Sequence, residues 1–87
     1  MYRFDFVAEA ERELDHFDSP TRTRILKRLK WLGKNADVIQ HEELSGPLSD
    51  LFKLRVGDYR VLYDIIESEN LIVVHQIGHR SEVYRRK

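Results

Sequence analysis

One stretch, residues 51–66, constrains the fold more than any other part of the chain. Apolar and polar residues alternate along it, the alternation stops at Gly57-Asp58, and it then resumes. This pattern predicts two antiparallel strands joined by a two-residue turn, and glycine in the first turn position favours a type II′ turn. Because the turn fixes the register, Val56 is expected to lie opposite Tyr59, and the remaining pairs follow by counting.

The predicted register divides the hairpin into two faces, because side chains alternate along a strand. One face is apolar and consists of Phe52, Leu54, Val56, Tyr59, Val61 and Tyr63. The other face carries Lys53, Arg55 and Arg60, with Arg55 directly opposite Arg60. Like charges opposite each other destabilise a sheet. The arrangement therefore indicates a use for the cations, and binding an anionic ligand is the simplest one.

Length and composition indicate the class of protein. The 87 residues predict one domain, residues 1–87, and the 41% hydrophobic and 34% charged composition is typical of a globular chain. No apolar run reaches the length of a membrane span, and acids stand where a signal peptide would be basic, so we expect a cytoplasmic protein with no membrane partner. The chain has no cysteine, and its four histidines and its acids show no ligand spacing, so we expect no metal and no other cofactor.

Two helices are predicted before the hairpin. Residues 2–7 alternate like a first strand, and apolar residues then recur at three- and four-residue steps in residues 8–17, as in an amphipathic helix. Ser19 is expected to cap a second helix, with Pro20 at its first position, where no amide hydrogen is needed. Residues 37–50 have no clear period and are interpreted as a connection.

A last strand is predicted after the hairpin. Residues 67–70 form a polar turn, and residues 71–77 are rich in β-branched side chains. The predicted order is therefore β-α-α-β-β-β, an α+β domain whose helical hairpin packs on one face of a mostly antiparallel four-stranded sheet. The apolar face of the central hairpin meets the helices in this arrangement, which leaves the cationic face open.

Counting across the second turn extends the cationic face. Pairing Ile66 with Leu71 places His75 opposite Leu62 and brings His79 to the face of the arginines. The residues gathered there are then Lys53, Arg55, Arg60, His79, Arg80 and Tyr84. Such a set suits a phosphodiester, because guanidinium groups bind phosphate, an aromatic ring stacks on a base and an imidazole transfers a proton near neutral pH. RNA cleavage by its own 2′-hydroxyl needs proton transfers and stabilisation of an anionic phosphorane, and no metal.

The chain resembles the RelE branch of the RelE/ParE superfamily of type II toxin–antitoxin toxins in its segments LFKLRVGDYRVLYDI and VVHQIGHRSEVYRR. The opening strand, the A-x-x-E-L segment at residues 10–14 and the L-x-G-x-L segment at residues 44–48 extend the resemblance over most of the chain. The resemblance implies a ribosome-dependent endoribonuclease that cuts mRNA and so inhibits translation. It also implies an antitoxin partner that neutralises this activity.

The resemblance carries over to particular residues. Arg60 in DYR corresponds to the arginine that contacts the scissile phosphate, Lys53 in KLR to a lysine of the catalytic surface, and Tyr84 in SEVY to the tyrosine that stacks on the base. The stretch between the family's glycine and SEVY is shorter here than in many members, so either His79 or Arg80 is the implied general acid. Relatives that use a histidine near this point also use a glutamate as base, and the sequence does not place Glu42 or Glu43 there, so the general base has no assigned residue.

Each assignment has an alternative. The arginines also fit a solvated charge network with Asp58, Asp64 or Glu82, and Tyr84 also fits a packing residue that anchors the C-terminal segment. His16 and His41 are interpreted as solvated. Two other functions stay open: a ParE-like toxin that binds DNA gyrase and cuts nothing, and an inactive scaffold that binds antitoxin. ParE-like relatives generally lack the arginine and tyrosine pattern, which favours the nuclease.

Overall fold

The computed structural model describes residues 1–85 and has two helices and one five-stranded sheet within them. The helices and strands are β1 (Arg3–Phe6), α1 (Ala8–His16), α2 (Ser19–Asn35), β2 (Glu42–Glu43), β3 (Phe52–Val56), β4 (Tyr59–Ile66) and β5 (Leu71–His79). Three 3₁₀ turns complete the described chain, η1 (Gly46–Leu48), η2 (Glu67–Glu69) and η3 (Val83–Arg85). No helix of this part of the chain is both long and apolar enough to cross a membrane.

The predicted α+β class is confirmed. The strand order is β1-β5-β4-β3-β2, with β1 parallel to β5 and the other neighbours antiparallel. The predicted number of four strands was wrong, because the connection at residues 37–50 contributes the two-residue edge strand β2. A strand this short has no periodicity to detect in the sequence.

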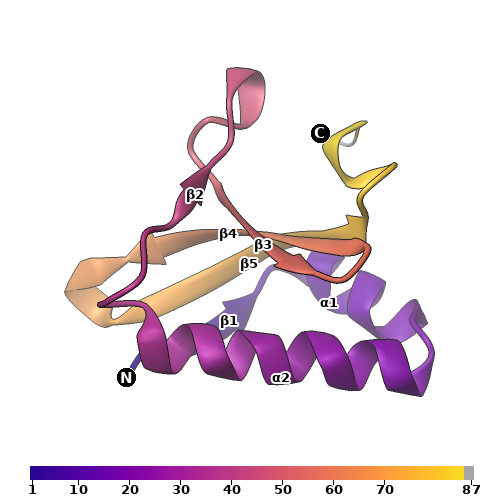
Figure 1. Cartoon of the computed structure of the whole chain (residues 1–87), viewed down its shortest axis with the longest axis horizontal. Coiled ribbons are helices and arrows are strands. Elements are labelled where there is room, and N and C mark those ends of the chain that lie inside the picture. The colour runs from indigo at the N-terminus through magenta and orange to yellow at the C-terminus, as the bar shows by residue number, and fades with distance from the viewer. Residues whose placement is uncertain (86–87) are drawn as a thin grey trace.

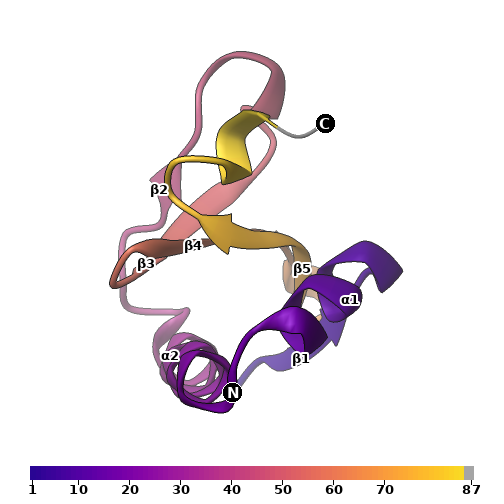
Figure 2. The same ribbon diagram turned by 90° about the vertical axis from the view of Figure 1, so that its right-hand side faces the viewer.

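The two faces of the sheet have different neighbours. Both helices lie on one side of it, while the loop that contains η1 and the C-terminal segment with η3 rise on the other side (Figures 1 and 2). The side between sheet and helices holds the core, to which α2 contributes Ile25, Leu29 and Leu32 and the sheet contributes Leu54, Val61, Tyr63, Ile72, Val74 and Ile77. The apolar face of the central hairpin therefore meets the helices, as predicted.

The start of α2 differs from the prediction by one residue. Asp18 is the capping residue, and its Oδ1 accepts a hydrogen bond from the Thr21 amide at 3.2 Å. Ser19 is already helical, so its predicted role as the cap was wrong. Serine and aspartate are comparable caps, and the sequence places them side by side.

The register of the central hairpin agrees with the prediction at every pair, from Val56 opposite Tyr59 to Phe52 opposite Tyr63. Gly57 has a φ of 59°, and Asp58 is not among the residues with positive φ. This combination is the one that a type II′ turn requires. Arg55 and Arg60 therefore lie directly opposite each other, on the face away from the helices.

The register between β4 and β5 differs from the prediction. Ile66 pairs with Leu71 as expected, but the ladder shifts at Leu62/Tyr63, and Leu62 pairs with Gln76 instead of His75. A β-bulge leaves one residue, His75, without an opposite partner. The bulge allows both Val74 and Ile77, an odd number of residues apart, to be fully buried in the core.

The close contact between α2 and β1 depends on Gly33. A Cβ atom at this position would lie 2.9 Å from Cζ of Phe4 and 3.0 Å from the backbone oxygen of Tyr2. Glycine elsewhere in a helix interior is unfavourable by about 0.5–1 kcal/mol relative to alanine. Here the absence of a side chain lets the helix approach the strand, and the Tyr2 amide donates to the Gly33 carbonyl at 3.0 Å.

We predict that Gly33→Ala lowers the free energy of unfolding by about 1–3 kcal/mol, because α2 must move away from β1. Thr23→Ala, at an exposed position of the same helix, should change it by less than about 0.5 kcal/mol. Urea denaturation of both variants measures the difference. A more stable Gly33→Ala variant, as helix propensity alone requires, would contradict the proposed close contact.

Candidate functional site

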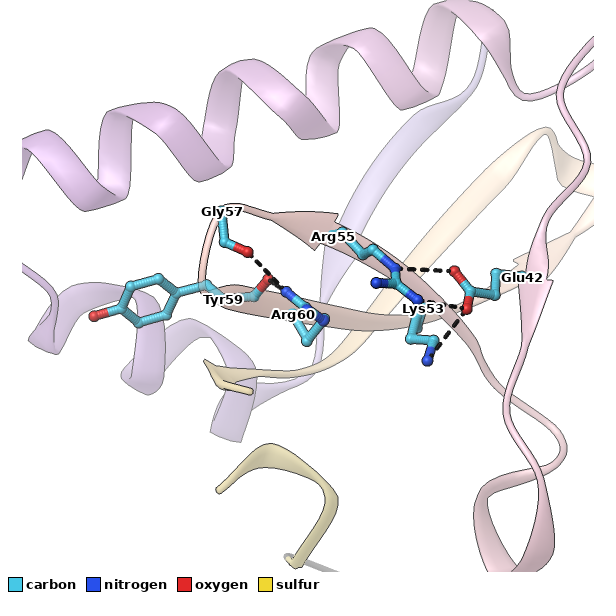
Figure 3. Close-up of polar contacts among 6 residues, drawn as sticks. All are labelled: Glu42, Lys53, Arg55, Gly57, Tyr59 and Arg60. Atoms are coloured by element: carbon cyan, nitrogen blue, oxygen red, sulfur yellow. Dashed lines mark hydrogen bonds and ion pairs between the residues drawn. The ribbon is translucent and has the colours of Figure 1, made fainter. Parts of the chain in front are cut away.

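The cationic face of the central hairpin carries an ion-paired cluster at its β2 end (Figure 3). Glu42 of β2 is paired with Lys53 of β3, and its Oε2 lies 3.2 Å from Lys53 Nζ and 3.2 Å from Arg55 Nη2. Arg55 Nε also donates to Oε1 at 3.4 Å. One carboxylate thus holds the two cations of β3 side by side.

These contacts change the acidity of Glu42. Hydrogen bonds from Arg55, and then from Lys53, lower the pKa of the Glu42 carboxyl below its usual value of 4.5. Glu42 is therefore ionised at neutral pH and offsets the repulsion between Lys53 and Arg55. Arg55 therefore belongs to a solvated charge network, as one alternative predicted, but its acid is Glu42 instead of Asp58, Asp64 or Glu82.

Arg60 has a different environment. Its side chain lies on the side of the hairpin away from α2, and Nη1 donates to the carbonyls of Gly57 and Tyr59, each at 2.8 Å (Figure 3). Among residues 1–85 no carboxylate forms an ion pair with it. Arg60 is nevertheless only 8% exposed. A largely buried cation with neutral acceptors alone is unfavourable unless an anion joins it.

The C-terminal segment makes this face less open than predicted. Val83 and Leu62 are fully buried, and the segment with η3 lies over the end of β5 (Figure 2). The prediction of an open cationic face was therefore wrong at Arg60, which is buried with its side chain turned back onto the carbonyls of Gly57 and Tyr59.

Tyr84 completes the cluster. Its ring centroid lies 5.6 Å from Lys53 Nζ, and the residue is 39% exposed. Val83 is the neighbour that is fully buried, so Val83 anchors the C-terminal segment in the way that the packing alternative had assigned to Tyr84. The Tyr84 ring lies against a cation with part of its surface free, which is the arrangement that stacking on a base requires.

His79 lies on the opposite face from Arg60, contrary to the predicted register. The bulge pairs His79 with Tyr59, and their rings pack edge to face with centroids 5.6 Å apart. Together with residues of α1, both line a cavity of about 500 Å³ on the helix side of the sheet. The Nδ1 atom of His79 is within 2.8 Å of Ser81 Oγ and accepts from the Ser81 amide.

Arg80 lies at the end of the central hairpin turn. Its amide donates to the Asp58 carbonyl at 2.8 Å, which prolongs the pairing of β4 with β5. The exposed guanidinium forms a long ion pair with Asp58, with 3.9 Å between Nε and Oδ1. Of the two residues implied as the general acid, His79 faces the helices, and Arg80 lies beside the hairpin turn at Asp58.

No group of three or more histidine, cysteine, aspartate or glutamate side chains in the described part of the chain is arranged to hold a metal ion. The described surface of the site consists of cations, one paired carboxylate and an aromatic ring. These groups bind and polarise an anion, and they supply proton donors.

Comparison with known proteins identifies the family. The model of the family described as the ParE toxin of the parDE type II toxin–antitoxin system matches residues 4–84. The chain belongs to this toxin family. It is also similar to toxin RelG of Mycobacterium tuberculosis, with 38% identity over 39 residues, which are 45% of this chain and 45% of RelG. The chain therefore matches less than half the length of that relative.

Two solved structures resemble the toxin over nearly its whole length. The isolated E. coli RelE toxin has a TM-score of 0.77 and 26% identity, with 98% of this chain and 93% of that chain covered. The E. coli RelBE toxin–antitoxin complex contains a chain with a TM-score of 0.74 and 25% identity, and the coverage is 91% of this chain and 96% of that chain. Both likenesses agree with the RelE/ParE resemblance seen in the sequence.

Sequence reasoning did not place Glu42 in the toxin's site. Glu42 and Glu43 lie within a connection without periodicity, residues 37–50, and only the pairing of β2 with β3 decides which of them reaches the cations. The signal in the sequence was the excess of cations on the hairpin, because their mutual repulsion is offset only if another segment supplies a carboxylate.

We predict that Glu42→Gln flattens the acid limb of the toxin's stability curve. A lowered folded-state pKa contributes stability that is fully present above the unfolded value near 4.5 and is lost as the pH falls through the folded value. Thermal unfolding from pH 7 to pH 2.5 measures this loss. Glu43→Gln, which removes no ion pair of the described residues, should retain the wild-type acid limb. Parallel curves for wild type and Glu42→Gln would contradict the pairing.

Proposed function

We propose that the toxin is an mRNA endoribonuclease that acts in the cytoplasm on ribosome-bound mRNA and inhibits translation. The 2′-hydroxyl of one nucleotide attacks the adjacent phosphodiester, and the chemistry requires no metal ion or other cofactor. The observation that carries the proposal is Arg60, a buried guanidinium with no carboxylate partner among residues 1–85, on the same face of the hairpin as Lys53, which a partly exposed Tyr84 contacts. This combination supports the binding of a phosphate and a base together.

The residues have distinct roles in this reaction. Arg60 binds the scissile phosphate and stabilises the charge of the phosphorane, and Lys53 and Arg55 add positive potential. Tyr84 stacks on a base of the substrate. Arg80 is our candidate for the general acid that protonates the leaving 5′-oxygen, so that the P–O5′ bond breaks to give a 2′,3′-cyclic phosphate and a 5′-hydroxyl. His79 is on the helix face, so a direct role as general acid requires the end of β5 to rearrange.

Glu42 is our candidate for the acceptor of the 2′-hydroxyl proton. It is the carboxylate that contacts two cations of the site, at 3.2 Å from each. Its lowered pKa makes it a weak base. This weakness fits a toxin whose site is completed by the ribosome, where the bound mRNA displaces Lys53 or Arg55 from the carboxylate.

A cognate antitoxin is the proposed protein partner. E. coli RelE forms a complex with RelB, and its chain resembles this toxin over 91% of the toxin's length. An antitoxin that covers the cationic face should be acidic where it meets Lys53, Arg55 and Arg60. Such a partner would supply the carboxylate that Arg60 lacks within the described chain.

We predict that Arg60→Ala reduces ribosome-dependent mRNA cleavage by at least about 100-fold, because one preorganised charge is lost from the transition state. Primer extension on mRNA in a translation extract measures the cleavage. Arg12→Ala removes an exposed arginine from α1 and should cut at the wild-type rate. Wild-type cleavage by Arg60→Ala, or no cleavage by the wild-type toxin with ribosomes present, would refute the proposal.

We predict different effects for two changes at Tyr84. Tyr84→Phe keeps an aromatic face and should cleave at close to the wild-type rate. Tyr84→Ala should lose about 1–3 kcal/mol of base stacking, which corresponds to a 5- to 150-fold lower kcat/KM. Cleavage kinetics on programmed ribosomes distinguish the two. Equal losses in both variants would assign the role to the hydroxyl group and exclude stacking.

A second candidate function is supported by the family description, which names the ParE toxin. In this alternative the toxin binds DNA gyrase and cleaves no nucleic acid itself. Gyrase-linked DNA cleavage complexes in cells that express the toxin, together with intact mRNA, would favour it. Cleaved mRNA without such complexes favours the ribonuclease.

A further inference from the structure

His41 links three parts of the fold through its imidazole ring. It immediately precedes β2, and its Nε2 is 2.9 Å from the carbonyl oxygen of Ala36 at the end of α2. Its Nδ1 is 2.5 Å from the hydroxyl oxygen of Tyr63 in the middle of β4. The ring also packs against Phe52 of β3, with centroids 5.4 Å apart. The expectation that His41 is solvated was wrong.

The partners of His41 define its protonation. A carbonyl oxygen only accepts hydrogen bonds, so the Nε2 atom must carry a hydrogen and donate it to Ala36. Burial raises the pKa of Tyr63 to about 12, so its phenol keeps its proton and has a hydrogen to donate to Nδ1. A neutral imidazole in the Nε2–H tautomer satisfies both contacts. Ala36 O, a carbonyl at the end of a helix, would otherwise have no helical partner.

Glu42, the residue after His41, connects the position of the imidazole to the cationic site. Successive side chains of a strand point to opposite faces, so His41 on the helix side directs Glu42 to the cationic side. β2 has two residues and pairs with β3 alone, at Lys53 and Phe52. Two ladder positions give an edge strand little stability of its own. The imidazole contacts therefore fix the position of β2.

We propose that His41, held by Ala36 and Tyr63, is a positioning residue that keeps the Glu42 carboxylate between Lys53 and Arg55. It contacts neither the cations nor the substrate. When the link is broken, β2 leaves its place, and the like charges of Lys53 and Arg55 lose the carboxylate that holds them together. The positioning of Glu42 by His41 is independent of the proposed function. The consequence for mRNA cleavage rests on the proposed function.

NMR spectroscopy of the full-length toxin tests the structural part. Long-range ¹H–¹⁵N correlations of the wild-type imidazole should identify Nε2 as protonated and Nδ1 as an acceptor, and a protonated Nδ1 in the neutral ring would overturn the proposal. The pKa of Glu42, followed by its carboxyl ¹³C shift, should rise towards 4.5 in Tyr63→Phe and in His41→Gln. Tyr63→Phe removes one hydroxyl group and keeps the ring packing.

His16→Gln is the matched control, because His16 is an exposed histidine of α1 whose Nδ1 contacts its own helix at the Arg12 carbonyl. It should leave the titration of Glu42 unchanged. An unchanged Glu42 titration in folded Tyr63→Phe and His41→Gln would overturn the proposal. If neither variant folds, the tautomer of the wild-type imidazole decides whether Ala36 and Tyr63 hold His41 as proposed.

Cleavage kinetics test the consequence. Both variants should cut ribosome-bound mRNA at least about tenfold more slowly than wild type, since small displacements of a catalytic group cost up to about 100-fold. A shifted Glu42 titration with full cleavage would overturn the catalytic role of His41. If the wild-type toxin cuts no mRNA, the proposed function fails, and the Glu42 titration still decides whether His41 positions this carboxylate.

Discussion

The two-residue turn at Gly57-Asp58 determines which side chains of the central hairpin meet the helices and which do not. Gly57 adopts a φ of 59°, and the pairs that follow put Leu54, Val61 and Tyr63 in the core. The same turn supplies the Gly57 carbonyl that accepts from Arg60. A shift of one residue would send the cations into the core, so the register of the fold and the composition of the site are set by one element.

The charges of the site are balanced in two different ways. Lys53 and Arg55 share the carboxylate of Glu42, which offsets their mutual repulsion. Arg60, opposite Arg55, is held by backbone carbonyls, whose dipoles orient the guanidinium without cancelling its charge. A phosphate that reaches Arg60 therefore meets a preorganised cation, whereas one that reaches Lys53 or Arg55 must compete with Glu42.

The sequence predicted the parts of the fold that local chemistry determines. The turn residues specify the β3–β4 register, and period changes locate both helices to within a residue or two. The α2 cap differed because Asp18 and Ser19 are adjacent and chemically similar as caps. The sequence also predicted that four residues of the site share one face, and the structure places them there: Lys53, Arg55, Arg60 and Tyr84.

Three features depend on tertiary context and were not predicted. The bulge opposite Leu62 and Tyr63 follows from the need to bury both Val74 and Ile77, and it moves His79 to the helix face. β2 exists because β3 offers an open edge and His41 fixes the approach. Arg60 is buried with its guanidinium on the carbonyls of Gly57 and Tyr59, and the C-terminal segment is anchored by the buried Val83. The bulge and β2 arise from contacts between residues far apart in the chain, which periodicity does not report.

The most direct measurement is a structure of the toxin on a ribosome whose mRNA carries 2′-O-methyl groups in the A-site codon, so that attack by the 2′-hydroxyl cannot occur. The scissile phosphate should lie within hydrogen-bonding distance of the Arg60 guanidinium, with a base stacked on Tyr84. An mRNA that passes only along the basic residues of α2, with Arg60 still bound solely to the Gly57 and Tyr59 carbonyls, would contradict the assignment of this face as the catalytic one.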